Sequence, residues 1–382
     1  MANAADAVAY NIAAFVTALF LLEFGADKFI DHTAIVAHRT NVPETVIGLV
    51  TAGAEWEELI VVIASLARNR ASLAIGNIIG SAISNILGAF SLGLLFHSND
   101  EAVQFDRSSR VYSLVLFAIT TFTAPILYLP SRSVWLLHGI LLIASFAIYI
   151  ASVGWAISRG SLTAPEGSDT DSSDGSDSSS DDESSEESEI DEAVPERRLV
   201  TVSDSRHDTQ RHQTSTPANP TTPLLPQPSR SRRRTLSYHL SYLILGFLGI
   251  CLAGYVLSHA ATTIVDELQM SDLVFGVVVL AIATTLPEKF IAVMSGQRGH
   301  TGVLIANTAG SNIFLLTLCL GIVVLSAKGS FPQGSVGVLE LSVLWASTAT
   351  FTATVWFGAR FCRWAGGTML VAYIVFIVLE FL

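Results

Sequence analysis

Long apolar runs, bounded by charged residues, proline or glycine, recur from one end of the chain to the other. A helix needs about 20 mostly apolar residues to cross a lipid bilayer. Runs that approach or exceed this length lie near positions 7–24, 43–67, 71–96, 111–129, 133–157, 238–262, 272–296, 301–326, 336–359 and 364–382. We therefore expect an all-α, polytopic membrane protein with about ten transmembrane helices. Nine is the alternative, because the first run is short and the last one ends with the chain.

The composition agrees with a membrane protein rather than a soluble one. Of the 382 residues, 51% are hydrophobic and 14% are charged, whereas about 25% of the residues in a soluble domain carry a charge. The three cysteines stand singly, without the CxxC or His/Cys clusters typical of disulfide frameworks and zinc sites. We expect an integral, multi-pass protein of the lipid bilayer with no cofactor and no nucleic-acid partner. The sequence leaves the plasma membrane and an intracellular organelle membrane both open.

One hydrophilic stretch, residues 159–236, interrupts the apolar runs. It contains SDTDSSDGSDSSSDDESSEESEIDE, which supplies much of the net charge of -12, and the proline-rich TPANPTTPLLPQPSRSRRR. Segments of this composition bury too little apolar surface to offset the entropy lost on ordering. We predict a disordered cytoplasmic loop that separates two membrane halves, 1–158 and 237–382. Ca2+ binding, phosphorylation and regulatory partners at its acids and serines are alternatives to a plain linker.

The basic residues predict how the halves are oriented. If the runs alternate across the membrane, most basic residues next to them lie on the same side as the long loop. Because basic residues accumulate on the cytoplasmic side, this loop is expected to be cytoplasmic. Each half then contains five spans, an odd number, so the two halves enter the membrane in opposite directions. The prediction is a fold of two inverted five-helix repeats.

The two halves share a pattern of polar residues at a constant spacing. The first repeat region, about 43–96, and the second, about 272–326, align without a gap around these positions. The matched pairs are Glu58 with Glu288, Ser65 with Ser295, Arg68 with Arg298, Asn77 with Asn307, Gly80 with Gly310, Ser81 with Ser311 and Ile83 with Ile313. Chance explains matched small or aliphatic residues, but not a matched Glu, Asn and Gly-Ser at one spacing. We predict a duplication. Opposed repeats with interrupted helices are typical of secondary transporters, whose substrate site lies near the bilayer midplane.

Three glutamates, Glu55, Glu57 and Glu58, stand within four residues of an otherwise apolar run. A carboxylate at the centre of a membrane helix costs roughly 2.5–3.5 kcal/mol on insertion scales, so such residues mark ion pathways and ion sites. Together Glu58 and Glu288 supply two negative charges, which match a divalent cation. We expect these two to be the principal ligands, Glu55 to modify the site, and Glu57 to be a bystander that faces water. The alternative for Glu288 is a structural ion pair with Lys289.

Amide and hydroxyl side chains accompany the acids. Asn77, Ser81 and Asn85 recur every four residues and so share one helix face, and Asn307 and Ser311 repeat this arrangement. Ca2+ takes about 6–8 oxygen ligands in flexible geometry, and these side chains offer the oxygens that the two carboxylates lack. The alternative is that the small residues of the segments GNIIGS and NTAGS only allow close helix packing.

Two motifs resemble those of a known family. Thr284–Glu288, TTLPE, is similar to the GTSLPEL signature of the sodium/calcium exchanger family of cation/Ca2+ antiporters. Gly76–Ser81, GNIIGS, is similar to its GNxxGSN signature, and Asn307–Asn312 is a second copy. The resemblance implies alternating-access exchange of Ca2+ for Na+, with one Glu from each repeat. It also implies a ligand set made of Glu58, Ser81, Asn85, Thr284, Thr285, Glu288 and Ser311.

The first repeat departs from the family pattern. Residues 54–57, AEWE, stand where the pattern has Thr-Ser-Leu-Pro, so Glu55 replaces a neutral ligand and the helix-breaking proline is missing. A third carboxylate favours proton coupling, because it can be protonated when no cation is bound. In addition, Ala82 replaces the Asn of GSN, and Leu315 stands where Asn85 has its match.

The function that these residues favour is secondary active exchange of Ca2+ for Na+. The alternatives are coupling to H+, transport of another divalent cation such as Mg2+ or Mn2+, and a homologue that no longer transports. Acid–base catalysis within the membrane is disfavoured, since the sequence has no nucleophile–base pair and no metal-ligand motif. We therefore expect a transporter of Ca2+ and a monovalent cation, and no enzyme.

Overall fold

A computed structural model describes residues 2–40, 55–97, 105–128, 132–158, 235–326, 336–358 and 361–382. All of them belong to one of the two compact units into which the chain divides, Met1–Gly167 together with Arg234–Leu382. In these described parts the regular structure consists of helices, without a strand, which confirms the all-α class. The second unit, Ser168–Arg233, and with it most of the predicted disordered loop, lies outside the described residues.

Helices follow one another along both halves, and η denotes a π-helical stretch that continues the helix on either side. The first half contributes α1 (Ala2–Arg39), α3 (Trp56–Ala67), α4 (Ala71–Ile83), η1 (Ser84–Phe90), α5 (Ser91–Leu95), α6 (Arg107–Tyr128) and α7 (Arg132–Ser158). The second half contributes α8 (Leu236–Leu268), α9 (Asp272–Val274), η2 (Phe275–Leu280), α10 (Ala281–Thr284), α11 (Leu286–Gln297), α12 (Thr301–Phe314), η3 (Leu315–Cys319), α13 (Leu320–Ser326), α14 (Val338–Phe357) and α15 (Cys362–Glu380).

Seven helices of the described part are long and apolar enough to cross a membrane, or up to eight if the bent segment from α9 to α11 is one span. Two further predicted spans are helical, but they are not long or apolar enough to be counted among these seven. α6 has 22 residues with Pro125 inside, and the described part of the second span, α3, has 12 residues. Residues 41–54 lie outside the described part. The fold is that of a multi-pass membrane protein, while the count of ten spans and their inverted orientation stay predictions.

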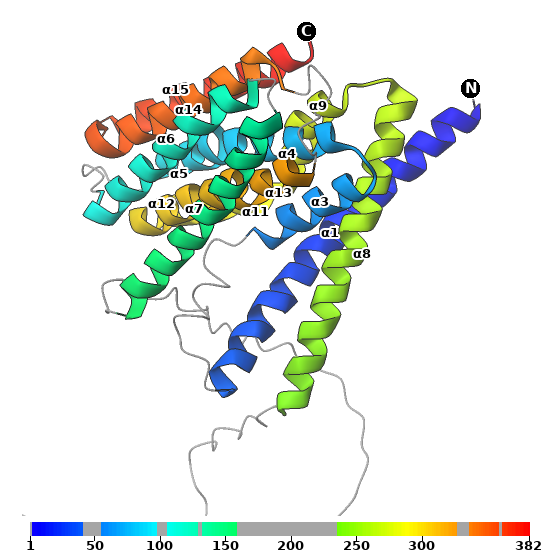
Figure 1. The fold of residues 1–382 in the computed structure, drawn as a ribbon, viewed down its shortest axis with the longest axis horizontal. Helices are drawn as coiled ribbons and strands as arrows, with labels where there is room; N and C mark the ends of the chain where they lie inside the picture. Colours follow the sequence, from blue (N-terminus) through cyan, green and yellow to red (C-terminus); the bar gives the residue numbers. More distant parts are fainter. Residues whose placement is uncertain are drawn as a thin grey trace, which may run out of the picture. The chain divides into compact units, whose positions relative to one another are not determined.

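The first helix is longer than the sequence predicted. α1 covers Ala2–Arg39 rather than 7–24, since charged residues after the apolar run, such as Glu23 and Lys28, are themselves good helix formers. The extension lies beside α8 (Figure 1). The two backbones touch there, because a Cβ atom added to Gly246 would lie 2.7 Å from the amide nitrogen of Phe29. Packing against α8 therefore stabilises a helix end that the apolar pattern does not reveal.

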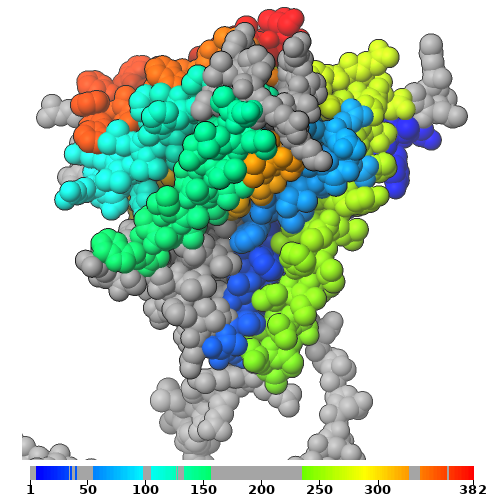
Figure 2. Space-filling view, viewed as in Figure 1, coloured from blue at the N-terminus to red at the C-terminus, as the bar shows by residue number. Residues whose placement is uncertain are grey.

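The two helices that carry the sequence motifs lie in the interior. In the most apolar window of α4 to α5, 89% of the residues are buried, and the corresponding value for α12 to α13 is 83%. In α1 and α7 it is 17%, and their exposed side chains include large apolar ones such as Phe20 and Leu137. Figure 2 shows α6 and α7 on the outside of the viewed face. Because large exposed apolar patches are unusual in soluble monomers, the outer helices are suited to face lipid.

The constant spacing between the repeats recurs in the backbone. The first residues of α3 and α11 are separated in the sequence by the same interval as Glu58 and Glu288, and so are their last residues. The first residues of α4 and α12 are also separated by this interval. The turn inside each hairpin contains a residue in the left-handed region, Asn69 with φ 59° and Gly299 with φ 71°. A π-helical stretch then follows in both copies, η1 after α4 and η3 after α12. Single π-helical turns inside α-helices often mark functional sites.

Glycines let the two halves approach closely. A Cβ atom added to Gly76 would lie 2.7 Å from the carbonyl oxygen of Leu273, and one added to Gly276 would lie 2.9 Å from the amide nitrogen of Asn77. Such contacts leave no space for a side chain. The packing interpretation is thereby confirmed for the glycines of GNIIGS. The same contacts fix the register of α4 against η2 and so position the polar side chains between these glycines.

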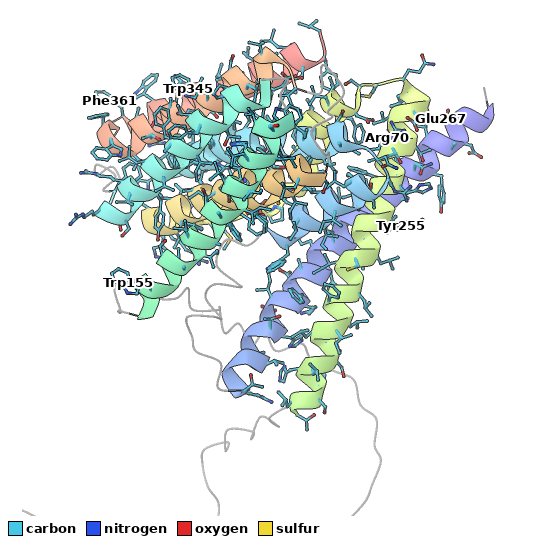
Figure 3. All side chains as sticks on the ribbon, in the orientation of Figure 1. Arg70, Trp155, Tyr255, Glu267, Trp345 and Phe361 are labelled. Atoms are coloured by element: carbon cyan, nitrogen blue, oxygen red, sulfur yellow. The ribbon has the colours of Figure 1, made fainter. Side chains whose placement is uncertain are left out.

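An ion-pair cluster also connects the halves. Arg70, which precedes α4, donates from Nη2 to Asp266 at 2.6 Å and from Nη1 to Asp272 at 3.1 Å. Figure 3 shows Arg70 beside α8, on which the labelled Glu267 also lies. The pair is partly exposed and therefore contributes little stability, since exposed pairs are typically worth about 0–1 kcal/mol.

Candidate ion-binding site

Both carboxylates singled out in the sequence lie in the first turn of a helix. Glu58 is in the first turn of α3, after Glu55 at its N-cap, and Glu288 is in the first turn of α11. Between α10 and α11 the axis bends by 49°, at Thr285 and directly before Pro287. The unpaired backbone N–H groups and the helix dipole favour negative charge at these positions. Each repeat thus delivers one acid to the inside of the bundle.

Glu58 is held by its own repeat. Its side chain is 1% exposed. The amide Nδ2 of Asn77 donates to Oε2 at 2.5 Å, and the hydroxyl of Ser81 donates to Oε1 at 3.0 Å. The hydroxyl of Thr284, from the second repeat, interacts with this carboxyl group, but its proton is donated to the carbonyl of Leu280. Both oxygens of Glu58 therefore have donors, and both donors belong to the first repeat.

Glu288 lies near the acids of the first repeat. It is 9% exposed, and its Oε2 has no hydrogen-bond partner among the described residues. Its carboxyl group interacts electrostatically with Glu55 and Glu58 of the first repeat. The hydroxyl of Ser311, which follows in α12, is also buried without a hydrogen-bond partner among the described residues. In the described part of the chain no ion pair within 4 Å joins Glu288 to Lys289, although the two side chains interact electrostatically.

The remaining predicted residues fall into two groups. Asn85 is fully buried, and neither polar atom of its amide has a partner among the described residues. Asn307 is only half-buried and makes no hydrogen bond within the described part, unlike its counterpart Asn77. Leu315 is fully buried within the apolar core, so the second repeat has no polar side chain at the position that matches Asn85. The structure thus places Asn85 among buried polar groups that lack partners, but not Asn307.

The two threonines before Glu288 differ in what their oxygens do. The hydroxyl of Thr284 donates to the carbonyl of Leu280 at 3.0 Å, which leaves its oxygen lone pairs available. The hydroxyl of Thr285 donates to the carbonyl of Ala281 at 2.6 Å and accepts a hydrogen bond from Lys289 Nζ at 2.5 Å. Thr285 is therefore already engaged by a cation that belongs to the chain itself.

Sequence reasoning missed two polar groups. Asn312 is fully buried with both amide atoms unpartnered among the described residues, and its place in the second GSN motif was the available signal. The other is Ser84, whose hydroxyl accepts from Lys289 Nζ and from the Tyr373 hydroxyl, both at 2.9 Å. No local signal predicts the latter contact, because Tyr373 comes from α15, the last helix of the chain.

Glu57 lies at the margin of this group. It is half-buried and interacts electrostatically with Glu55 and Glu58, and also with Glu23 and Asp27 of α1. Acids of α1 therefore lie close enough to Glu57 of α3 to interact with it. That Glu57 is a bystander that faces water stays a prediction.

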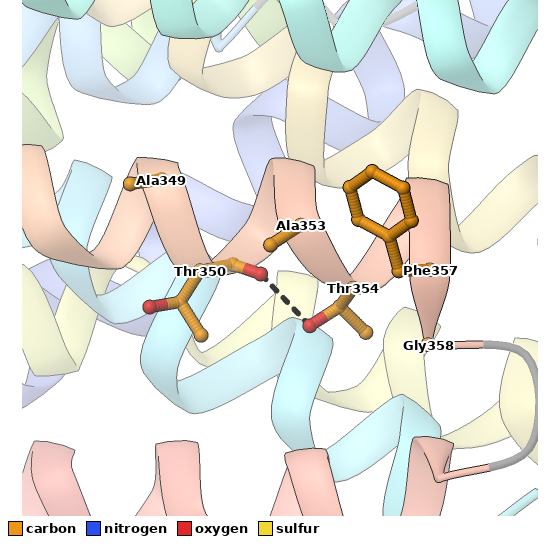
Figure 4. Close-up of a pocket in the computed structure, with 6 residues that line it drawn as sticks. All are labelled: Ala349, Thr350, Ala353, Thr354, Phe357 and Gly358. Atoms are coloured by element: carbon orange, nitrogen blue, oxygen red, sulfur yellow. Dashed lines mark hydrogen bonds between the residues drawn. The ribbon is translucent and has the colours of Figure 1, made fainter.

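The carboxyl groups do not form a metal cage by themselves. Within the described residues, no group of three or more His, Cys, Asp or Glu side chains is close enough to hold a metal ion. Neutral oxygens from Ser, Thr and Asn must therefore take part in any cation site. The groove in Figure 4 lies elsewhere, on the surface of α14, and contains none of the predicted ligands; its lining residues are Ala349, Thr350, Ala353, Thr354, Phe357 and Gly358.

Buried acids from two equivalent helix hairpins, inside a bundle of membrane-spanning helices, define an integral multi-pass transporter of cations. The model of the family described as "Sodium/calcium exchanger protein" matches residues 10–155 and 238–382, more than half of the chain. The chain belongs to this sodium/calcium exchanger family and is an antiporter of that type. The two matched segments flank the hydrophilic stretch.

Known proteins agree with this assignment. CaxA of Alkalimonas amylolytica is 24% identical over 361 residues, which cover 93% of this chain and 94% of CaxA. The sodium/calcium exchanger MaX1 of Methanosarcina acetivorans is 28% identical over 120 residues, or 30% of this chain and 33% of MaX1. Among solved structures, the sodium-calcium exchanger NCX_Mj soaked with 2.5 mM Na+ and 10 mM Sr2+ has the same fold, with a TM-score of 0.54, 22% identity and coverage of 97% of this chain and 99% of that one.

Proposed function

We propose that this exchanger binds one Ca2+ between Glu58 and Glu288 and exchanges it for Na+ by alternating access. The observation that carries the proposal is a set of buried polar atoms from both repeats that have no hydrogen-bond partner among the described residues: Oε2 of Glu288, Oγ of Ser311 and the amide atoms of Asn85. A hydrogen bond of 2.9 Å between the hydroxyls of Ser84 and Thr285 joins the two repeats next to them. Residues that are far apart in the sequence thereby share one buried polar region. No enzymatic step is assigned to the chain.

A full Ca2+ shell can be assembled from this region. The Glu58 and Glu288 carboxylates supply the charge, and about 6–8 oxygens are needed in all. The neutral oxygens proposed as further ligands are those of Ser81, Asn85, Thr284, Ser311 and Asn312. Asn77 is proposed to orient Glu58 through its amide nitrogen, which donates to that carboxylate, while its amide oxygen has no partner among the described residues and can contact the ion.

Electrostatics couples the two ions. Several carboxylates without a counter-ion are unfavourable in a low-dielectric interior. The chain is therefore expected to change between inward-open and outward-open states with Ca2+ or with Na+ bound, and rarely with neither. Since both ions need the same carboxylates, binding of one displaces the other. A ligand shifts such an equilibrium only by its differential affinity for the two states.

Proton coupling is the second candidate, and the presence of a third acid favours it. Glu288 interacts electrostatically with Glu55 as well as with Glu58, and a carboxylate close to other carboxylates is more easily protonated when no cation is bound. A site that holds a proton when it lacks a cation can release it when Ca2+ binds. Mg2+ fits less well, because it demands a near-ideal octahedral shell.

Ca2+ uptake into proteoliposomes with one imposed gradient at a time tests the proposal. Uptake driven by a Na+ gradient at equal pH on both sides is the expected result. Uptake driven only by a pH gradient would replace Na+ by H+, and absence of uptake under both gradients would contradict the proposal. Glu267→Gln, an exposed acid on α8, is a matched control that should leave uptake unchanged.

The domain organisation is proposed to follow the same symmetry. Membrane halves 1–158 and 237–382 would each supply one repeat, near 43–96 and 272–326, with the hydrophilic segment 159–236 between them on the cytoplasmic side. Regulators that act on this acidic segment are part of the proposal, and limited proteolysis from either side of sealed vesicles checks its location.

A further inference from the structure

Lys289 places a positive charge next to the proposed ion site. It follows Glu288 directly in α11, and its ammonium is partly buried. The Nζ atom donates to Ser84 Oγ at 2.9 Å, to the carbonyl oxygen of Thr285 at 3.0 Å and to Thr285 Oγ1 at 2.5 Å. Three neutral oxygens from both repeats thus surround one cation.

The hydrogen bonds around this ammonium are mutually consistent. Thr285 donates its own hydroxyl proton to Ala281, so its Oγ1 accepts from Lys289 and from the Ser84 hydroxyl, 2.9 Å away. Ser84 in turn accepts from Lys289 and from Tyr373. Every proton in the network has an acceptor. The oxygens are therefore arranged to receive a monovalent cation, and the lysine supplies it.

No carboxylate of the described residues lies within 4 Å of this ammonium. Arg70, by contrast, has two aspartates. A partly buried lysine is normally paired, because removal of an unpaired charge from water is costly. Here neutral hydroxyl and carbonyl oxygens solvate the ammonium group, as water molecules solvate a free ion. Such oxygens are also the ligands that hard cations prefer.

The charge of Lys289 offsets that of Glu55. In the first repeat the position equivalent to Lys289 is Leu59, which directly follows Glu58, so this cation has no counterpart there. Ionised Glu55, Glu58 and Glu288 together with the ammonium carry two net negative charges. One Ca2+ neutralises them. The third carboxylate therefore does not call for an additional transported cation.

We propose that the Lys289 ammonium is a tethered cation that permanently fills one monovalent-cation site of the transport pathway. It determines the coupling ratio: each Ca2+ is exchanged for one Na+ fewer than in a chain without this ammonium. The inference rests on the proposed Ca2+/Na+ exchange. It assigns Thr285 and Ser84 to the tethered cation instead of to a transported ion.

The test compares coupling ratios in proteoliposomes loaded with radiolabelled Na+ and Ca2+. Lys289→Met removes the ammonium and keeps the length of the side chain, so it should raise the number of Na+ ions moved per Ca2+ by one. Lys28→Met is the matched control, since it removes an ammonium from α1, where Lys28 lies over the ring of Phe24, and should not change the ratio. An unchanged ratio in Lys289→Met overturns the inference.

A second variant tests the same inference independently. Thr285→Val removes the hydroxyl that the ammonium contacts, and it should leave the ratio of the wild-type chain unchanged, because no transported Na+ uses that oxygen. In the Lys289→Met background it should remove the additional Na+. A lower ratio for Thr285→Val alone would place a transported Na+ at Thr285 and overturn the inference.

Two further outcomes are distinguishable. If Lys289→Met folds without transporting, the dependence of its unfolding midpoint on Na+ concentration still counts the bound ions by linkage, and a steeper dependence than in the wild type is expected. An equal dependence contradicts the inference. If the wild-type chain shows no Na+-driven Ca2+ flux, the proposed function fails, and the tethered-cation inference fails with it.

Discussion

The hairpin of α3 and α4 and the hairpin of α11 and α12 have nearly the same backbone and different polar contacts. Their helix boundaries and left-handed turn residues recur at one constant spacing. In the first hairpin both oxygens of Glu58 accept hydrogen bonds from Asn77 and Ser81. In the second, Glu288 keeps one oxygen without a partner among the described residues, and it interacts electrostatically with Glu55 and Glu58 of the other repeat.

The difference shows that a duplicated backbone does not guarantee a duplicated site. The first hairpin is organised before any ion arrives, because its own side chains orient the carboxylate. The second relies on a proton or a cation to satisfy Glu288. We infer that the first hairpin contributes a preformed half of the ion site and that the second completes it when the ion binds.

Removal of either carboxylate should have the largest effect. Glu58→Gln and Glu288→Gln each leave the site with too little charge for a divalent ion, and breaking a buried charge interaction costs about 3–5 kcal/mol. Ca2+ transport should fall by more than about 100-fold in both, since about 1.4 kcal/mol corresponds to a factor of ten. Flux measurements at saturating Na+ gradient check this, and near-normal flux in either variant would contradict it.

The same two variants should differ in stability, which sharpens the comparison. In Glu58→Gln the new amide group faces donors from Asn77 and Ser81, so a buried donor loses its acceptor at a cost of about 1–3 kcal/mol. Glu288→Gln has no such conflict. Thermal unfolding in detergent without Ca2+ should show a lower midpoint for Glu58→Gln only. Equal losses of stability in the two variants would contradict the inferred difference between the two hairpins.

The two equivalent asparagines should differ as well. Asn77→Ala removes a hydrogen bond to a charged group, worth about 1.5–3 kcal/mol, and should weaken Ca2+ binding roughly tenfold or more. Asn307→Ala should change it less than about twofold, because this half-buried side chain makes no hydrogen bond in the described part of the chain. Calcium titration of the purified variants measures both values, and similar losses would show that the hairpins act symmetrically.

The turns should show the smallest difference. Arg70→Ala removes the partly exposed ion pairs to Asp266 and Asp272 and should lower the free energy of unfolding by about 0–1 kcal/mol, less at high salt. Arg298→Ala, in the turn of the second hairpin, should have no measurable effect, since Arg298 forms no ion pair within the described residues. Unfolding at low and high ionic strength separates the two, and a salt-independent loss in Arg70→Ala would argue against an electrostatic link.

Local sequence was informative where the physics is local. Apolar runs and the constant spacing between matched polar residues predicted both hairpins, and the cost of a carboxylate in an apolar run directed attention to Glu58 and Glu288. The glycines of GNIIGS were equally explained by packing, which the close approach to Leu273 confirms. These features depend on neighbours within a few turns of helix.

Contacts between distant segments were not predictable in this way. The hydrogen bond from Tyr373 to Ser84 joins α15 to η1, and the hydrogen bond between Ser84 and Thr285 joins the two repeats. The length of α1 depends on packing against α8 rather than on its own apolar pattern. That Asn307 and Asn77 both bind the ion stays a prediction. In the structure their hydrogen bonds and burial differ.

Calcium titration of the purified chain by isothermal calorimetry tests the central claim most directly. The account predicts one Ca2+ per chain, lost in Glu58→Gln and equally lost in Glu288→Gln, because acids from both repeats hold the same ion. Retention of wild-type affinity in either variant, or two independent sites that these substitutions remove one at a time, would contradict it.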